Sequence, residues 1–140
     1  MERYSVSFFV RERATSAEIK TSKDLYEAVK DLADADREMF VVILLNARQA
    51  IIGREVVSIG TLNQSLVHPR EVFKSAIVKS AGSIVIVHNH PGGTTTPSCE
   101  DDAVTRRLVS AGKIIGIPIL DHIIVGDNGY YSYRDHGVLS

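Results

Sequence analysis

In the second half of the chain the sequence reads HNHPGGTTTPSCED, from His88 to Asp101. The apolar run Ile84–Val87 precedes it, so His88 and His90 stand at the end of a predicted strand, where side chains two residues apart point to the same face. A loop rich in glycine, threonine and proline follows, and Ser98 and Asp101 then have the spacing of a helix N-terminal capping pair. Two imidazoles and one carboxylate are the three protein ligands of a catalytic zinc site whose fourth position holds water. The pattern therefore predicts one zinc ion per chain, bound by His88, His90 and Asp101.

Hydrophobic periodicity around this stretch predicts an α/β domain of the α+β type, a mixed β-sheet flanked by about three helices. Helices are predicted to begin at Thr21 or Ser22, at Pro69 and at Ser98, and the last two to end near Gly82 and at Gly112 or Gly116. Strands are predicted at residues 6–10, 38–45, 51–59, 83–87, 117–120, 123–125 and 130–133, with 38–45 and 51–59 antiparallel. Residues 12–20 are charged and are expected to form a loop or arm.

The composition indicates one domain with an ordinary hydrophobic core, since 44% of the 140 residues are hydrophobic and 24% are charged. A formal net charge of −1 gives no general attraction to nucleic acid or to anionic membranes, although it is compatible with a local basic patch. The single cysteine, Cys99, excludes an internal disulfide, and the sequence shows neither a signal peptide nor a run of about 18 apolar residues. We therefore expect a cytoplasmic protein that does not enter a membrane. Exposed edge strands of the mixed sheet favour a homodimer.

The spacing His88-x-His90-x7-Ser98-x2-Asp101 resembles, position for position, the JAMM motif of the MPN+ (JAB) metalloproteases. Four segments are also similar to the bacterial RadC family: residues 60–63 (GTLN), 68–72 (HPREV), 88–93 (HNHPGG) and 120–123 (LDHI). The sequence around the motif therefore resembles the RadC family in particular.

This resemblance covers the chain from Thr21 to Leu139 and departs from the family at Gly92, where the family usually has a serine. It implies a JAB/MPN-like fold of the cytidine-deaminase-like type, in a single RadC-like MPN/JAMM domain over residues 21–140. An N-terminal strand or arm over residues 1–20 would precede this domain. The sequence lacks the helix-hairpin-helix region of longer family members, so it resembles the short forms that carry only the catalytic domain. A bacterial, cytoplasmic location is implied as well.

The resemblance further implies a catalytic glutamate that opens the strand after the first helix, and Glu38 occupies that place. It implies that Glu38 is the general base for a zinc-activated water and that Ser98 stabilises the oxyanion during hydrolysis of an amide bond. On composition alone, Glu55 in the next strand and Glu71 at the start of a helix compete with Glu38. Glu55 is the main alternative.

Two further residues near the motif have both a structural and a functional interpretation. Cys99 is the right residue type for a zinc ligand, but as the residue after the helix cap we expect it to point elsewhere. His122, next to Asp121, is either a buried structural histidine, which we favour, or a residue that supports the site.

The leading hypothesis is a zinc-dependent metallohydrolase of the JAMM type, a peptidase or isopeptidase with a peptide or protein substrate. The alternative is a DNA-repair-associated accessory protein of the RadC family that has a metal site but little hydrolytic activity. A chelator would abolish activity in the first case, whereas binding that weakens steeply with salt would mark the second. A purely structural module is disfavoured, because burying unpaired polar groups only costs stability.

Overall fold

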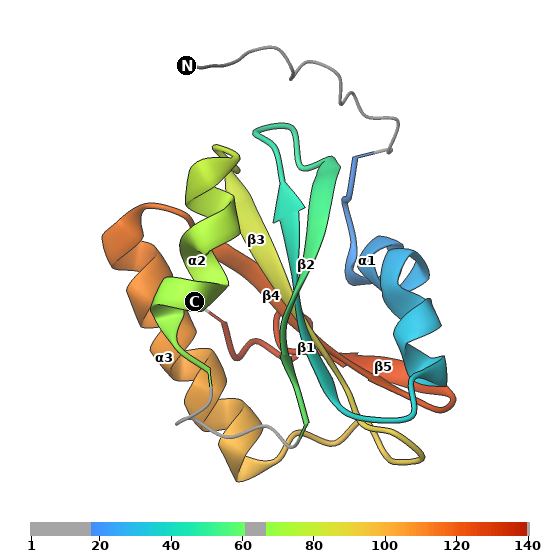
Figure 1. The fold of residues 1–140 in the computed structure, drawn as a ribbon. Helices are drawn as coiled ribbons and strands as arrows, with labels where there is room; N and C mark the ends of the chain where they lie inside the picture. The colour runs from blue at the N-terminus through green and yellow to red at the C-terminus, as the bar shows by residue number, and fades with distance from the viewer. Residues whose placement is uncertain (1–17, 61–66, 140) are drawn as a thin grey trace.

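The computed structural model describes residues 18–60 and 67–139 (Figure 1). The predicted strand at residues 6–10 and most of the predicted arm lie outside the described residues. The helices are α1 (Ser22–Val29), the 3-10 helix η1 (Lys30–Asp34) that follows it directly, α2 (Pro69–Val78) and α3 (Cys99–Ile115). The strands are β1 (Met39–Leu45), β2 (Ile51–Ile59), β3 (Ser83–Asn89), β4 (Ile119–Gly126) and β5 (Gly129–Ser132).

These strands form one mixed five-stranded sheet in the order β2-β1-β3-β4-β5. β3 and β4 are parallel and α3 connects them, whereas the other neighbouring strands are antiparallel. The carboxyl end of the central strand β3 lies beside the start of β1, because His88 pairs with Phe40. The structure thus confirms the predicted mixed sheet with three α-helices.

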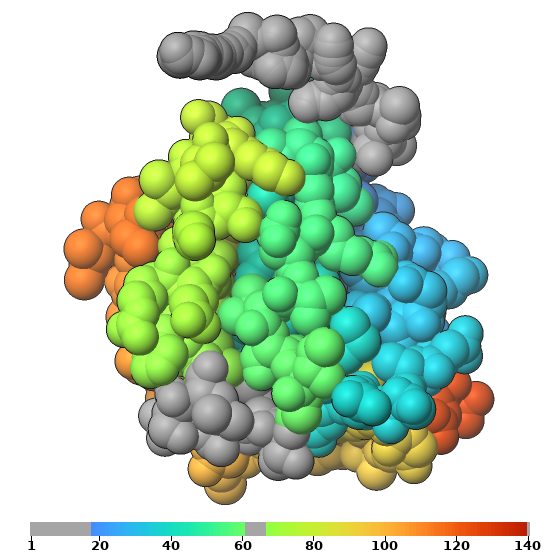
Figure 2. All heavy atoms as spheres, viewed as in Figure 1, coloured from blue at the N-terminus to red at the C-terminus, as the bar shows by residue number. Residues whose placement is uncertain are grey.

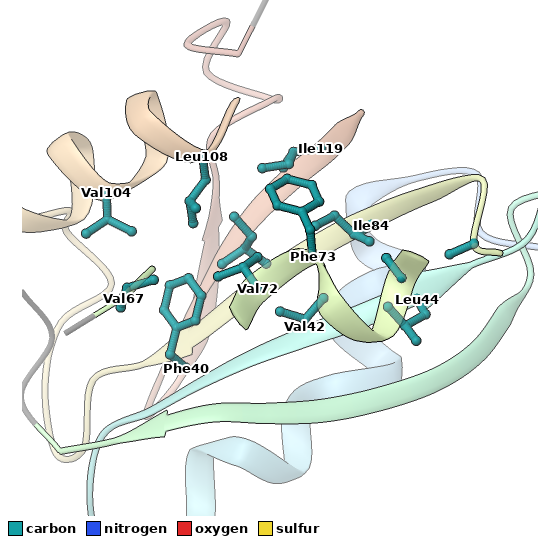
Figure 3. Packing of buried hydrophobic residues seen from close by; sticks show 13 residues of the cluster. Phe40, Val42, Leu44, Val67, Val72, Phe73, Ile84, Val104, Leu108 and Ile119 are labelled. Carbon is teal, nitrogen blue, oxygen red and sulfur yellow. The ribbon is translucent and has the colours of Figure 1, made fainter. Parts of the chain in front are cut away.

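Helices cover both faces of the sheet (Figure 1). On one face α2 and α3 pack over alternate residues of β1 and β3, and Phe73 and Leu108 are fully buried in the core between them (Figure 3). On the other face α1 packs against the remaining set of strand residues. The alternation along β3 places His88 on the same face as Ile84 and Ile86, which α2 and α3 cover. The first histidine of the motif is therefore directed toward α3.

The two edges of the sheet differ in how far they are covered. The atoms of β2 form an open strip between α2 and α1 in Figure 2, and the side chains of Val56 and Ile59 are about half exposed. At the opposite edge the ring of Tyr130 in β5 stacks on Tyr26 of α1, with 4.6 Å between ring centroids. β2 is therefore an accessible edge strand, whereas α1 partly covers β5.

The helix ends differ from the sequence prediction at one place. α2 ends at Val78 rather than near Gly82, because Ser80 adopts a left-handed conformation (φ 55°) with which an α-helix cannot continue. The end of α3 lies at one of the two predicted glycines, Gly116, which is the left-handed C-cap (φ 88°), whereas Gly112 lies inside the helix.

Two predicted strands are longer than expected. β3 does not end at Val87 but continues to Asn89. The predicted stretches 117–120 and 123–125 contribute to a single strand, β4, which runs without interruption through Asp121 and His122. Both polar residues are fully buried, so the strand continues through a polar pair whose partners come from elsewhere in the fold.

Candidate metal centre

The two histidines of the motif are held by strand backbone. His88 pairs with Phe40 of β1 and with Ile124 of β4, and its side chain is only 2% exposed. The backbone N–H of His90 donates to the carbonyl of Val125 at 2.9 Å, which extends the contact between the two parallel strands. The imidazole rings lie 4.9 Å apart between centroids. Their positions are therefore fixed by the centre of the sheet.

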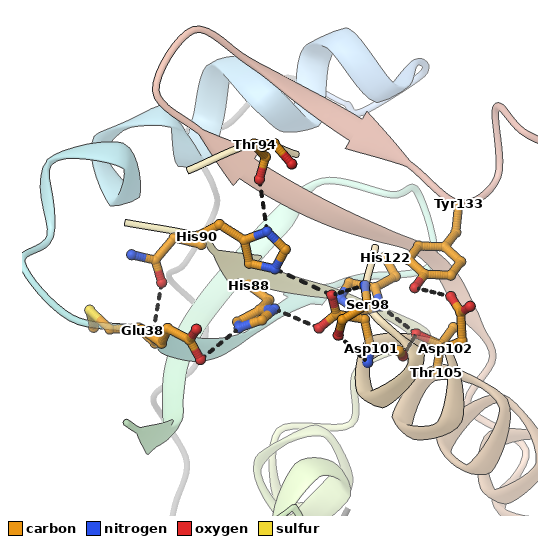
Figure 4. A network of polar contacts seen from close by, with 12 residues as sticks. Glu38, His88, His90, Thr94, Ser98, Asp101, Asp102, Thr105, His122 and Tyr133 are labelled. Atoms are coloured by element: carbon orange, nitrogen blue, oxygen red, sulfur yellow. Dashed lines mark hydrogen bonds and ion pairs between the residues drawn. The ribbon is translucent and has the colours of Figure 1, made fainter. Parts of the chain in front are cut away.

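The third residue, Asp101, comes from the first turn of α3. Ser98 caps this helix as predicted: its Oγ accepts a hydrogen bond from the N–H of Asp101 (3.0 Å), and Oδ2 of Asp101 accepts one from the N–H of Ser98 (2.8 Å). The buried carboxylate also reaches both imidazoles, with Oδ1 3.1 Å from His88 Nδ1 and Oδ2 3.2 Å from His90 Nε2 (Figure 4). One ligand atom from each of the three residues lies within 4.8 Å of the others. The structure therefore brings together a cluster that could bind a metal ion.

The hydrogen bonding of both imidazoles fits this interpretation. His90 Nδ1 lies 2.8 Å from the carbonyl oxygen of Thr94, so it carries the hydrogen and leaves the lone pair of Nε2 directed toward Asp101. Both ring nitrogens of His88 are buried and neither makes a well-formed hydrogen bond, although carboxylate oxygens lie near them. A buried polar atom without a hydrogen bond is costly, and coordination of a cation would offset that cost. Two imidazoles and a carboxylate suit zinc and several other transition metals, so the donor set fits a metal without identifying it.

The charges within the cluster stabilise one another. Burial alone would raise the pKa of Asp101, but the contacts with His88 and His90 outweigh burial and hold that pKa far below its usual range. The same contact with the Asp101 carboxylate raises the pKa of His90. Asp101 is therefore an ionised carboxylate at neutral pH, as a metal ligand has to be.

Glu38 lies immediately before β1, beside the histidines. Its Oε1 is 3.5 Å from Nε2 of His88, and its side chain is 30% exposed, so the carboxylate lies between the buried cluster and solvent (Figure 4). Its backbone carbonyl accepts a hydrogen bond from the N–H of Gly60 at 2.8 Å, which joins the start of β1 to the end of β2. The sequence-predicted glutamate is therefore adjacent to the candidate metal ligands.

The two competing glutamates lie elsewhere in the fold. Glu55 pairs with Val42 on the edge strand β2, and its carboxylate lies 3.8 Å from Nζ of Lys79. Glu71 is an exposed residue in the first turn of α2. Neither of them belongs to the cluster of candidate ligands among the described residues.

Asn89, between the two histidines, has a role that the sequence did not predict. Its Oδ1 accepts a hydrogen bond from the N–H of Met39 (2.6 Å), and its Nδ2 donates to the carbonyl of Arg37 (3.1 Å). These two contacts bracket Glu38 and tie the segment that carries it to the end of β3. The side chain of Asn89 points away from the face of the histidines, so only the pairing of β1 with β3 reveals its partners.

His122 is fully buried in β4 and lies behind the cluster. Its Nδ1 is 2.5 Å from Oγ1 of Thr105 in α3, and its ring stacks on Tyr133 with 4.7 Å between centroids. Burial, together with the nearby charge of His88, lowers the pKa of His122 to about 3, so the ring is neutral at physiological pH. His122 is therefore a buried, neutral residue beside the ligand cluster and not a member of it.

Asp121, the residue before His122 in β4, is held by hydrogen bonds from residues near the C-terminus. Asp121 accepts hydrogen bonds from Oγ of Ser132 (2.5 Å) and from the N–H of Arg134 (2.9 Å), and burial raises its pKa. Asp121 therefore fastens the C-terminal segment to β4.

Cys99 is exposed at the start of α3 and does not belong to the ligand cluster within the described part of the chain.

No helix within residues 18–60 and 67–139 combines the length and the apolar character that crossing a membrane requires.

A sequence model of the RadC-like JAB domain matches residues 19–138. Three similar curated relatives carry the name UPF0758 protein. The relative from Desulforamulus reducens is 55% identical over 79% of this chain and 49% of its own length, and that from Symbiobacterium thermophilum is 56% identical over 78% and 47%. The relative from Methanosarcina mazei is 49% identical over 85% of this chain and 52% of its own length. The chain thus spans about half the length of the curated relatives it matches.

Proposed function

Because the chain belongs to the family of RadC-like JAB domains, we propose that it is a zinc-dependent hydrolase that cleaves peptide or isopeptide bonds. One observation carries this proposal: the buried cluster of His88, His90 and Asp101 has a second carboxylate, that of Glu38, 3.5 Å from His88 Nε2. Three ligands with a further carboxylate beside them are the parts that hydrolysis by an activated water requires.

His88, His90 and Asp101 would hold the zinc ion. Zinc in such a site supplies Lewis acidity and lowers the pKa of a bound water to about 7. Asp101 is suited to this role because it is ionised and because the helix cap at Ser98 holds its carboxylate in place. The hydrogen bond from His90 to Thr94 keeps the Nε2 of that ring available as the ligand atom.

Glu38 and Ser98 would supply the proton transfer and the stabilisation of charge. Oε1 of Glu38 would take a proton from the attacking water and return it to the leaving amine as the C–N bond breaks. Oγ of Ser98 accepts the hydrogen bond from Asp101 N–H and retains its own hydrogen, which it would donate to the oxygen of the developing tetrahedral species. Both residues lie next to the ligand cluster, on the start of β1 and the start of α3.

The surface beside His90 suits an extended polypeptide. A groove of about 570 Å³ runs between the loop 92–95 and the turn 127–130. Thr94 lines it and also accepts the hydrogen bond from His90, so the groove adjoins the ligand cluster. A peptide or protein chain lying there would bring a backbone amide to the edge of the site.

The first test is the metal content of purified protein, measured by elemental analysis. We expect about one zinc ion per chain in the wild type and almost none in the double variant His88→Ala/His90→Ala. The matched control is His136→Ala, which removes an exposed histidine outside the cluster and should leave the zinc content unchanged. A wild type that takes up no zinc after dialysis against the metal would overturn the proposal.

The second test separates metal binding from catalysis. Glu38→Gln should retain zinc but lose roughly 10²- to 10⁴-fold in the rate at which a peptide library is cleaved, read out by mass spectrometry. A chelator should abolish cleavage by the wild type, and added zinc should restore it. Cleavage that persists in Glu38→Gln, or that the chelator does not affect, would contradict the assigned role of this residue.

A further inference from the structure

Behind the candidate metal ligands, a buried pair of residues joins α3 to the sheet. Thr105 is 2% exposed and lies one turn after Asp101 in the helix, whereas His122 is fully buried and comes from β4. Oγ1 of Thr105 donates to the backbone carbonyl of Asp101 at 2.7 Å and lies 2.5 Å from Nδ1 of His122 (Figure 4). Thr105 therefore links the ring of His122 to the backbone of Asp101.

The direction of these hydrogen bonds follows from the number of hydrogens available. The hydroxyl of Thr105 has one hydrogen, and the carbonyl of Asp101 can only accept it. The hydrogen between Thr105 and His122 therefore belongs to Nδ1 of the imidazole, which donates to Oγ1. Nε2 of His122 makes no hydrogen bond within the described residues, so the hydrogen bond of this ring is the one from Nδ1 to Thr105.

The candidate ligands come from two different elements, and this pair links those elements. His88 and His90 depend on β3, and His122 belongs to the adjacent parallel strand, where it pairs with Ile86. Asp101 depends on α3, whose capping box with Ser98 fixes the carboxylate relative to the helix but not relative to the sheet. The chain of hydrogen bonds from His122 through Thr105 to Asp101 fixes the start of α3, and with it Asp101, relative to the sheet.

We propose that His122 and Thr105 position Asp101 for metal binding, an inference that rests on the proposed function because it takes Asp101 to be a metal ligand. They are positioning residues, since neither belongs to the ligand cluster. Their effect is on where the carboxylate of Asp101 lies relative to the two imidazoles. Removing the hydroxyl of Thr105 would release that constraint while leaving every ligand in the chain.

The test compares Thr105→Val, which has nearly the same shape but lacks the hydroxyl, with Thr105→Ser, which keeps it. The affinity for zinc is measured by competition with a chelator, and the visible spectrum of the cobalt(II)-loaded protein reports the ligand geometry. We expect Thr105→Val to bind zinc about 10- to 100-fold more weakly than the wild type, with an altered cobalt spectrum. Thr105→Ser should restore both the affinity and the spectrum.

Ser132→Ala is the control for loss of a buried hydroxyl outside the chain of hydrogen bonds from His122 to Asp101. The hydroxyl of Ser132 is buried and donates to Asp121 at 2.5 Å, whereas the hydroxyl of Tyr133 interacts with Thr105 itself and is unsuitable for this purpose. Ser132→Ala should bind zinc as the wild type does. His122→Phe keeps a planar ring against Tyr133 but removes Nδ1, so it should reproduce the effect of Thr105→Val and replaces that variant if the latter does not fold.

The outcomes distinguish this inference from the proposed function. Wild-type zinc affinity and an unchanged cobalt spectrum in Thr105→Val and His122→Phe would overturn the positioning role and leave the metal site intact. Equal losses in Thr105→Val, Thr105→Ser and Ser132→Ala would also overturn it, because a general loosening of the domain would then explain them. Failure of the wild type to bind zinc would instead remove the proposed function, and the inference with it.

Discussion

A single buried residue, His122, makes the stability of the folded protein depend on pH. Its pKa is lowered from 6.5 to about 3 in the folded protein, chiefly by burial. Between these two pH values the unfolded chain binds a proton at this residue and the folded chain does not, so stability falls as the pH falls through this window. The contribution is fully present above pH 6.5.

We therefore expect His122→Gln, which cannot titrate, to weaken the pH dependence. Between pH 6 and pH 4, the free energy of unfolding of the metal-free protein should change by about 1.4 kcal/mol less per pH unit than in the wild type. Urea unfolding at several pH values, in the presence of a chelator, measures this difference. Parallel pH profiles for the two proteins would contradict the prediction, because they would mean that His122 binds a proton between pH 4 and pH 6 in the folded state as it does in the unfolded state.

At the scale of single residues, the candidate ligands were predictable because they are close in sequence. His88, His90 and Asp101 lie within one strand end, one loop and one helix start, so local spacing is sufficient to predict that they converge. Glu38 was proposed only through the family resemblance, with Glu55 left open, because the choice depends on strand pairing. Asn89 was missed altogether, since its partners lie 50 and 52 residues away in the chain.

At the scale of elements, residues 18–60 and 67–139 contain two capping boxes of the same chemistry. Thr21 and Asp24 start α1 with the same pair of reciprocal hydrogen bonds as Ser98 and Asp101 at the start of α3. Only the second box lies beside the histidines. The first box is therefore an internal control that separates the structural role of a cap from its role in the site.

Thr21→Ala and Ser98→Ala should each lower the free energy of unfolding by about 1 kcal/mol, because each removes the acceptor for one helix N–H. Only Ser98→Ala should slow peptide hydrolysis, by roughly 10²- to 10³-fold, since it also removes the proposed oxyanion donor. Urea unfolding and the peptide-library assay measure the two effects separately. Similar hydrolysis rates in the two variants would limit Ser98 to its role as a cap.

Element boundaries were predictable where local chemistry sets them. The cap at Ser98 and the left-handed Gly116 define the two ends of α3; the sequence predicts the first, and narrows the second to Gly112 or Gly116. The early end of α2 depends on the conformation of Ser80, a residue that seldom adopts a positive φ and therefore gave no signal. The extent of β4 is harder to predict, because burial of Asp121 and His122 is acceptable only with partners from α3, from β5 and from the segment after β5.

At the scale of the whole molecule, the sheet order brings distant segments to one place. The antiparallel pairing of β1 with β3 places Glu38 beside His88, and the α3 crossover between β3 and β4 returns Asp101 to the same strand end. A mixed sheet with helices on both faces followed from the periodicity, but its strand order did not. Periodicity reports which face of a strand is buried and contains no information about its neighbours.

If the proposed site binds zinc, this arrangement would make zinc stabilise the entire domain, because the candidate ligands join α3 to the centre of the sheet. Zinc at a free concentration of 100 times its Kd should raise the free energy of unfolding by about 2.7 kcal/mol, on the order of 10 °C in Tm for a chain of this size. Asp101→Asn should lose this shift while keeping a side chain that can cap the helix, whereas Asp24→Asn, the same change in the α1 box, should retain it. Thermal unfolding of each variant with zinc and with a chelator measures the difference. Equal zinc-induced shifts in both variants would mean that zinc binds elsewhere on the fold, since Asp101 contacts both histidines and Asp24 belongs to the separate cap of α1.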